Sequence, residues 1–375
     1  MLTPSSRDRD FPSLAEKPYF NTAAEGIPPL VVLEALQQYG RDKLLGMDGR
    51  ELHQKVWESA KQQIAKAYGM TPGEVSLCSC SSEAYNLTAM ALGLREGDEV
   101  VINDLDFPAG ATPWLHQSCP ATVKVWKARD WALRVEDLIP LLSPRTRFVT
   151  TSLVSFFNGH TIDLAEVAHA VRKHSPALFG VDVTQALGRI PLVLDEADLV
   201  ISSTHKWILA SHGGGLVGVR SNVAERLTPP AGGWFHLENA FEADRFERVV
   251  PKSGAASYSV GMPNYPAVYA IEAGLKYIQS VGVEAIAQHC NPLVRTCLEE
   301  LKRLPVELMT PDEPGHVAGI VAFKHPDFAR LHADLHRENI HVMSHAGRLR
   351  IAIHGYNDQA SVDRLVATLQ KSLGA

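Results

Sequence analysis

The chain contains 375 residues, which exceeds one simple core, so we expect one large and one small domain. Its 45% hydrophobic and 21% charged residues are typical of a globular protein, and a net charge of −6 without a long basic run argues against nucleic acid as a partner. No apolar stretch has membrane length, and the charged N-terminal segment lacks the apolar core of a signal peptide. Five cysteines without a C-x-x-C pair suit a reducing compartment, so we expect a cytoplasmic protein with no membrane partner.

The N-terminal part predicts a tail, an extended piece and two helices. The extended piece PYFNTAAEG ends in small residues, and Pro28 and Pro29 stand near the start of the helix that follows. Apolar residues then recur at helical spacing over residues 51–69, which predicts the second helix.

A strand, a cluster of hydroxyl residues and a helix are expected next, in LCSCSSEAYNLTAMALGL. Free amides and the dipole of a helix N-terminus attract a phosphate dianion, so Ser81 and Ser82 are candidate phosphate ligands. With Glu83 they could also form a simple helix cap, and the two interpretations are compatible.

Strand-like and helix-like segments alternate from this point to Asp182. Strands are expected in EVVIN, at 122–126 and 147–154, and in LFGVDV, with helices near 135–142 and at 164–174. Repeated strand–helix–strand units predict a mostly parallel sheet covered by helices on both faces, with a site at the C-terminal ends of the strands.

The stretch that follows carries the chemistry. Asp182 ends a strand, Gln185 lies three residues later, and Lys206 closes the polar run SSTHK. An aldehyde cofactor needs one lysine amine to form an imine, and its pyridine nitrogen needs an anion that keeps it protonated. This order predicts pyridoxal 5'-phosphate, with Lys206 as the amine and Asp182 as the anion.

Two further patterns suggest other sites, and we reject both. The run GGGLVG satisfies G-x-G-x-x-G, but its glycines open an apolar strand, whereas a dinucleotide fingerprint opens a helix. His332 and His336 have a zinc-like spacing on a helix without an evident third ligand, so we expect no metal.

The C-terminal part predicts a smaller α/β unit. Helices are expected near 283–303 and 358–373, and strands near 317–323, 340–343 and 348–353. We therefore expect an N-terminal strap at 1–25, a large cofactor-binding domain at 26–262 and a small domain at 263–375.

From about Tyr19 to the C-terminus the chain resembles a known family. Its D-x-x-Q followed by S-x-H-K-W is similar to that of fold-type I pyridoxal phosphate enzymes of the class V aminotransferase group, which includes cysteine desulfurases, isopenicillin N epimerase and kynureninase. The resemblance implies a large domain with a mostly parallel, seven-stranded sheet between helices, a small α/β domain, and a homodimer with shared active sites.

The resemblance also implies roles around the cofactor. Ser203 and His205 match positions that bind the phosphate, and Gln185 would approach the phenolic oxygen. Phe107 stands where desulfurases carry a ring-stacking histidine, although it could instead be a core residue. Asn158 could replace the asparagine whose position is taken here by Phe156.

Other matched positions concern the substrate and the partner subunit. Arg350 is the candidate for the substrate α-carboxylate, with Arg348 on the same strand face as the alternative. Asn21 lies in a segment that covers the active-site mouth in relatives, or else in a surface turn. Where relatives place a threonine that reaches the partner's phosphate, this chain has Met262, so Asn264 or the Gly261 amide would have to serve.

The segment before Arg350 bears on the reaction. In ENIHVMSHAGRLR there is no cysteine to form the persulfide of a desulfurase, and His345 in this loop could act as an acid or base or simply face solvent. We therefore expect an enzyme that transforms an amino acid through a Cα carbanion, in the epimerase or lyase branch. A class V aminotransferase is the alternative, and a non-catalytic cofactor-binding protein is the second alternative.

Overall fold

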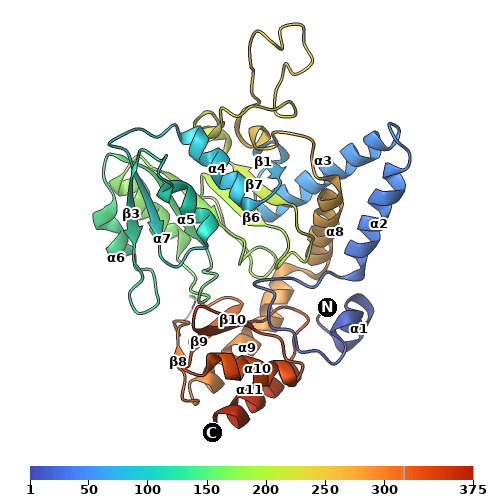
Figure 1. The fold of residues 1–375 in the computed structure, drawn as a ribbon, viewed down its shortest axis with the longest axis vertical. Helices are drawn as coiled ribbons and strands as arrows, with labels where there is room; N and C mark the ends of the chain where they lie inside the picture. Colours follow the sequence, from blue (N-terminus) through green and yellow to red (C-terminus); the bar gives the residue numbers. More distant parts are fainter. Residues whose placement is uncertain (314, 316, 375) are drawn as a thin grey trace.

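The computed structural model describes residues 1–313, 315 and 317–374, and its larger part is built on a seven-stranded sheet (Figure 1). The strand order is β1-β7-β6-β5-β4-β2-β3. The strands are β1 (Val75–Cys78), β2 (Glu99–Asn103), β3 (Thr122–Trp126), β4 (Thr146–Ser152), β5 (Leu178–Asp182), β6 (Leu199–Ser203) and β7 (Gly215–Val219). β7 is the only strand of this sheet that runs opposite to the other six, so the expected mostly parallel sheet is confirmed.

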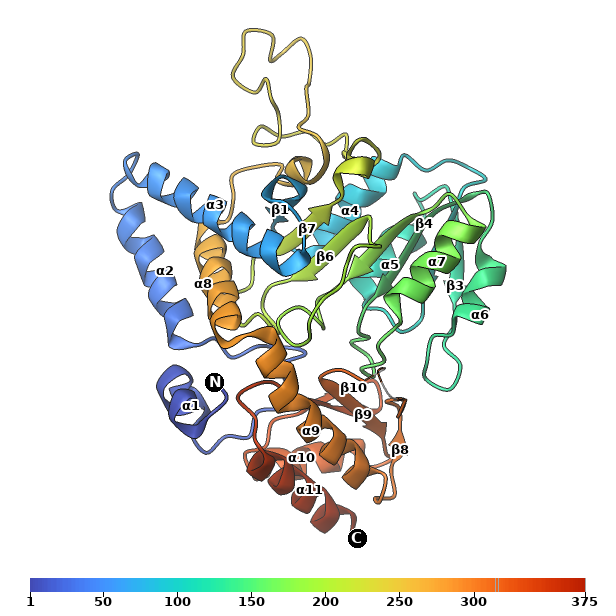
Figure 2. The same ribbon diagram turned by 180° about the vertical axis from the view of Figure 1, so that it is seen from behind.

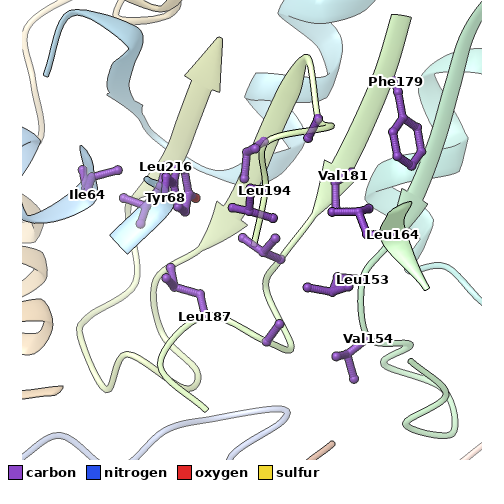
Figure 3. Packing of buried hydrophobic residues seen from close by; sticks show 14 of the residues in the cluster. Ile64, Tyr68, Leu153, Val154, Leu164, Phe179, Val181, Leu187, Leu194 and Leu216 are labelled. Carbon is purple, nitrogen blue, oxygen red and sulfur yellow. The ribbon is translucent and has the colours of Figure 1, made fainter. Parts of the chain in front are cut away.

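Helices cover both faces of this sheet (Figures 1 and 2). They are α3 (Gly49–Tyr68), α4 (Ser81–Leu92), α5 (Pro108–Leu115), α6 (Val135–Leu138), α7 (Leu164–His174) and α8 (Tyr265–Val281), and α2 (Leu30–Lys43) packs on the outside of α3 and α8. The central strand β5 is buried on both sides, because Leu178 packs in one apolar cluster and Phe179 and Val181 pack in another. Figure 3 shows part of the second cluster, where Val181 lies near Leu164 of α7. Burial on both faces explains the continuous apolar sequence of this strand.

A four-stranded antiparallel sheet forms the smaller part, in the order β10-β11-β9-β8. Its strands are β8 (Glu307–Leu308), β9 (Ile320–Lys324), β10 (Met343–His345) and β11 (Arg348–Ala352). It packs with α9 (Val283–Leu301), α10 (Phe328–Arg337) and α11 (Gln359–Leu373), as expected for a small α/β unit.

The N-terminal segment is more ordered than a tail. Its helix α1 (Pro4–Asp10) begins with a capping box between Thr3 and Ser6, and Phe11 and Phe20 are buried in the core of the smaller part. Short 3-10 turns complete the chain: η1 (Pro12–Leu14), η2 (Pro72–Glu74), η3 (Ile139–Leu141), η4 (Ser221–Leu227) and η5 (Gly254–Tyr258).

Helix α8 connects the two parts. Its residues Ala267, Ile271 and Leu275 pack in the core of the large sheet, whereas Ile278 packs in the core of the small one. We therefore propose that the small domain begins near the end of α8, and that a boundary at residue 263 would divide the large core.

Two further observations concern the surface. Between η4 and η5 the chain forms a long loop that projects away from the rest of the molecule, with Phe241 and Phe246 exposed (Figures 1 and 2). No helix in the described part of the chain has the length and apolarity that a membrane crossing requires.

Candidate active site

The C-terminal edge of the parallel strands brings Asp182 and Lys206 together. Asp182 ends β5, and Lys206 follows β6, which pairs with β5 in parallel. The Asp182 carboxylate accepts hydrogen bonds from the Thr184 amide at 2.8 Å and the Tyr85 hydroxyl at 3.2 Å. Burial raises the pKa of Asp182, while Thr184, the charge of Lys206 and Tyr85 oppose that rise. A carboxyl group is therefore held by directed donors beside a lysine amine.

Lys206 is poised to react as a neutral amine. Its side chain is 8% exposed, and its Nζ lies 5.2 Å from the centre of the Phe107 ring. Burial lowers the pKa of Lys206 to about 8; the charge of Arg350 adds to that fall, and the charge of Asp182 opposes it. A substantial neutral fraction near pH 8 is what attack on a carbonyl group requires.

A second carboxyl group, Asp106, lies beside this pair and was missed by the sequence analysis. Its oxygens accept hydrogen bonds at 2.8 Å from the amide of Ser152 and from the side chain of Asn103. Ser152 is the β4 residue that pairs with Asp182 of β5. Burial raises the pKa of Asp106 to about 7, and the charge of Asp182 contributes to the rise. In the sequence, the feature that could have indicated Asp106 as a site residue is its position directly before Phe107.

Two serines from distant segments meet at the start of α4. The hydroxyl oxygens of Ser81 and Ser203 are 3.1 Å apart, and Ser82 is exposed on the same turn. The first amides of a helix have no intrahelical acceptor, so this turn offers several donors to an anion. Glu83 accepts bonds from the amide and hydroxyl of Ser79 at 2.6 and 2.5 Å, so it fixes the loop before the helix. The helix-cap interpretation and the anion-binding interpretation are thus compatible in the structure.

His205 directly precedes Lys206 and stands two residues after Ser203 in the chain. Burial lowers its pKa to about 4, with further contributions from the charges of Lys206 and His212. Its ring stacks on that of His212, with the ring centres 4.5 Å apart. A neutral imidazole retains one N–H group that can donate to an anion. The Gly26 amide donates to the His205 carbonyl at 2.8 Å and brings the N-terminal segment to the site.

Phe107 is a surface residue of the site and not a core residue. Its side chain is 46% exposed, and its ring meets Phe156 edge to face at 5.1 Å between ring centres. An exposed aromatic face beside the Lys206 amine can stack on a flat heterocycle.

Asn158 does not face this site. Its amide nitrogen donates to the carbonyls of Trp131 at 2.7 Å and Met309 at 3.0 Å, and its oxygen accepts from the His160 amide at 3.0 Å. Both amide hydrogens are used and the side chain is fully buried. We therefore no longer propose Asn158 as a cofactor ligand, because it joins the loop after β4 to the segment after β8.

Gln185 and Asn264 also have protein partners. Gln185 accepts from the Trp207 ring nitrogen at 2.6 Å and donates to the Ala23 carbonyl at 3.0 Å, which leaves one amide hydrogen for another acceptor. Asn264 donates to the Gly213 carbonyl at 3.1 Å and caps α8. Both residues thus position backbone at the site, and a contact to the cofactor remains a proposal for each.

Arg350 of β11 presents an open guanidinium edge. Its Nη1 donates to the Phe156 carbonyl at 2.7 Å, whereas its buried Nε and Nη2 have no hydrogen-bond partner among the residues that the structure describes. Nε and Nη2 form one edge of the guanidinium, and that edge can bind both oxygens of a carboxylate. Burial, and then the charge of Arg348, lower the pKa of Arg350 to about 9. Because its charge also acts on Lys206, we favour Arg350 over Arg348 for the α-carboxylate.

Asn21 lies on the same side as Arg350. It forms a parallel bridge with Ala352, two residues beyond Arg350 on β11, and alternate residues of a strand face the same side. Its Oδ1 is buried, and within the described ranges it has no partner. Its carbonyl also accepts from the amides of Ala24 and Glu25, so the segment is a turn as well.

These side chains fit pyridoxal phosphate. Asp182 matches a ring nitrogen, Lys206 matches the aldehyde, and the donors around Ser81 match a phosphate. The unpaired edge of Arg350 matches the carboxylate of an amino acid. By contrast, the described residues contain no group of three or more His, Cys, Asp or Glu side chains that could hold a metal ion.

Comparison with known proteins decides the family, because the family model described as Aminotransferase class-V matches residues 18–365. The chain belongs to the class V aminotransferase family. Its cofactor is therefore pyridoxal phosphate, and the fold, cofactor and family that the sequence predicted are confirmed.

Curated relatives span nearly the whole chain. An uncharacterized aminotransferase, YcbU, from Bacillus subtilis (strain 168) is 27% identical in an alignment that covers 92% of each chain. A probable cysteine desulfurase from Pasteurella multocida (strain Pm70) is 26% identical in an alignment that covers 99% of this chain and 93% of the relative.

Solved structures share the fold at low identity. A cysteine desulfurase from Thermococcus onnurineus NA1 superposes with a TM-score of 0.89 at 22% identity and covers 100% of this chain and 99% of that one. The cystine C-S lyase C-DES, in complex with its product cysteine persulfide, gives a TM-score of 0.87 at 24% identity and covers 96% and 98%.

Proposed function

We propose that this class V enzyme transforms an amino acid by removing its Cα proton, in the epimerase or lyase branch of the family. The observation that carries the proposal is the unpaired Nε and Nη2 edge of Arg350, which lies close enough to Lys206 for its charge to lower the pKa of the amine. A protein that only bound the cofactor would not need a buried arginine with an edge open to a substrate carboxylate, because an unpaired buried charge destabilises the fold.

Each site residue then has one role. Pyridoxal phosphate supplies, when bound, an aldehyde that condenses with an amine and a ring that withdraws electrons from Cα. Asp182 would hold the proton on the ring nitrogen, and Ser81, Ser82, Ser203 and His205 would hold the phosphate.

The substrate's own contacts come from the other side of the site. Arg350 would bind the α-carboxylate, with Asn21 beside it. Lys206, once released as a neutral amine, would accept the Cα proton, because its pKa of about 8 suits a base near neutral pH. Return of a proton to the opposite face gives an epimer, and loss of a Cβ group gives a lyase product.

The cysteines of the C-terminal part of the chain favour this branch over sulfur transfer. The segment before Arg350, residues 338–347, contains no cysteine. Cys290 and Cys297 are buried in α9, and burial raises their pKa values to about 11 and about 12. A persulfide mechanism requires a thiolate at the substrate sulfur, and neither of these thiols meets that requirement. Transamination, which needs no residue beyond those above, is the second candidate.

We also propose a homodimer with shared active sites. Met262 is 47% exposed on the turn before α8, beside Asn264, where a residue of one subunit could approach the phosphate of the other. An exposed apolar side chain next to a polar one at this turn is suited to an interface.

Product analysis in deuterated water tests the reaction. The loaded enzyme is incubated with a panel of amino acids and the products are analysed by chiral chromatography and mass spectrometry. Deuterium at Cα with inverted configuration identifies an epimerase, and a keto acid with a released side-chain fragment identifies a lyase. A keto acid with aminated cofactor identifies the aminotransferase and contradicts the proposal. A cofactor absorption band unchanged by every amino acid indicates a protein that only binds the cofactor.

A further inference from the structure

Two arginines share one face of β11. Arg348 and Arg350 are two residues apart on this strand, so their side chains leave the sheet on the same side. Their side chains are 1% and 2% exposed. In the part of the chain that the structure describes, neither guanidinium forms an ion pair with a carboxylate. This face therefore contains two buried cations without a protein anion.

Two of the three guanidinium nitrogens of Arg348 have hydrogen-bond acceptors in the protein. Its Nε donates to the Phe157 carbonyl at 2.9 Å and its Nη1 to the His345 carbonyl at 3.2 Å. Its centre lies 3.7 Å from the centre of the Phe157 ring, which supports it by a cation–π contact. Its Nη2 is buried and has no acceptor in the described residues. The group is thus rigidly placed with one nitrogen left to donate.

A third buried arginine shows how this chain treats a structural guanidinium. Arg189 is 0% exposed, and its Nε donates to the Ile353 carbonyl at 3.0 Å. Both of its terminal nitrogens donate to Asn291 at 3.2 Å. Every nitrogen of Arg189 has an acceptor, in contrast to Arg348 and Arg350.

We propose that Arg348 binds a second anionic group, carried by the substrate side chain, so that the preferred substrate is an acidic amino acid. This inference rests on the proposed function, in which Arg350 binds the α-carboxylate. The Arg348 guanidinium lies 5.7 Å from the centre of the Phe156 ring, and that ring contacts Phe107 beside the Lys206 amine, so Arg348 lies at the edge of the same site. Arg348 donates to the Phe157 carbonyl and Arg350 to the Phe156 carbonyl, so the two guanidinium groups lie side by side. Two neighbouring guanidinium groups can bind the two carboxylates of a short dicarboxylic amino acid.

Binding of simple carboxylates to the loaded enzyme tests this assignment without turnover. Isothermal titration calorimetry compares glutarate, which has two carboxylates, with butyrate, which has one. We expect glutarate to bind about tenfold tighter than butyrate, because a hydrogen bond to a buried charged group typically changes affinity by that factor or more. In Arg348→Gln this advantage should disappear while butyrate binds as before, and Arg348→Lys should keep part of it.

Three results would overturn the inference. Glutarate could bind no tighter than butyrate in the unmodified enzyme, or Arg348→Gln could retain the full advantage. Equal weakening of both ligands in Arg348→Gln would mean that the two arginines hold one carboxylate. Arg350→Gln tests the proposed function separately. Loss of butyrate binding in this variant supports Arg350 as the ligand of the α-carboxylate, whether or not Arg348 binds a second carboxylate. Arg348→Lys keeps the charge and most of the side chain, so it covers the case in which the glutamine variant does not fold.

Discussion

The hydroxyl of Tyr85 donates to the carboxylate of Asp182 over 3.2 Å, from a helix to the end of a strand 97 residues later. Tyr85 lies one turn beyond Ser81 on α4, so both residues lie on one face of the helix. The helix that presents hydroxyl and amide donors at its first turn therefore also supports the anion of the site. One rigid element thus fixes the distance between the two ends of the cofactor site.

Loss of this donor should weaken cofactor binding. We expect Tyr85→Phe to reduce pyridoxal phosphate affinity about tenfold, because a hydrogen bond to a charged group contributes roughly 1.5–3 kcal/mol. The pKa of Asp182 should rise, since Tyr85 lowers it, so the absorption spectrum of the bound cofactor should also change with pH. Tyr258→Phe is the matched control, because Tyr258 is equally buried and bonds Thr88, away from Asp182. Equal effects of the two substitutions would exclude a specific role for Tyr85.

The rate of cofactor uptake should report the pKa of Lys206. Only the neutral amine attacks the aldehyde, so uptake by cofactor-free protein should rise with pH and level off above about pH 8, as stopped-flow absorbance would show. In Asp182→Asn the midpoint should move to lower pH, because the charge of Asp182 raises the pKa of Lys206. A midpoint near the ordinary value of 10.5 would contradict the buried position of the amine.

The buried guanidinium of Arg350, with Nε and Nη2 left without a partner in the described residues, should destabilise the cofactor-free protein. Its folded pKa of about 9 lies below the ordinary 12.5, so the charged form costs stability below pH 9, and the cost decreases as pH rises toward 12.5. We expect Arg350→Leu to raise the free energy of unfolding at pH 7.5 by about 1–3 kcal/mol in chemical denaturation, while carboxylate binding is lost.

Arg189→Leu provides the opposite case. Arg189 is equally buried but its nitrogens all have acceptors, so this substitution should destabilise the protein by about 3 kcal/mol or more. If both substitutions destabilise the protein to the same extent, Arg350 is a structural residue, and the proposal that it binds the substrate α-carboxylate is wrong.

Asn158 should matter for stability and not for the cofactor. Asn158→Ala removes three hydrogen bonds and leaves buried carbonyls unpaired, so we expect a loss of about 2–4 kcal/mol in the free energy of unfolding. Cofactor affinity at a temperature where the variant is folded should stay within about twofold of the original protein. A large fall in affinity with unchanged stability would restore the role first predicted for this residue.

The sequence predicted those parts of the site that depend on local order along the chain. Asp182 ends one apolar strand and Lys206 follows another, and adjacent parallel strands bring such positions to one edge of the sheet. The helix at 164–174 and the strand at 122–126 were also predicted correctly, because caps and periodicity mark them locally.

Contacts between distant segments could not be predicted in this way. The bonds of Asn158 to Met309 and of Tyr85 to Asp182 depend on how loops from separate elements pack. The division of roles between Arg348 and Arg350 depended on which nitrogens the fold leaves unpaired, and no pattern of residue types contains that information.

Borohydride trapping tests the central claim most directly. Reduction of the loaded protein should fix one cofactor per chain on Lys206, as a peptide of increased mass, and Lys206→Ala should contain no labelled peptide. Lys324→Ala, which removes a lysine of the small sheet, should be labelled like the original protein. Undiminished labelling of the Lys206→Ala protein would contradict the account.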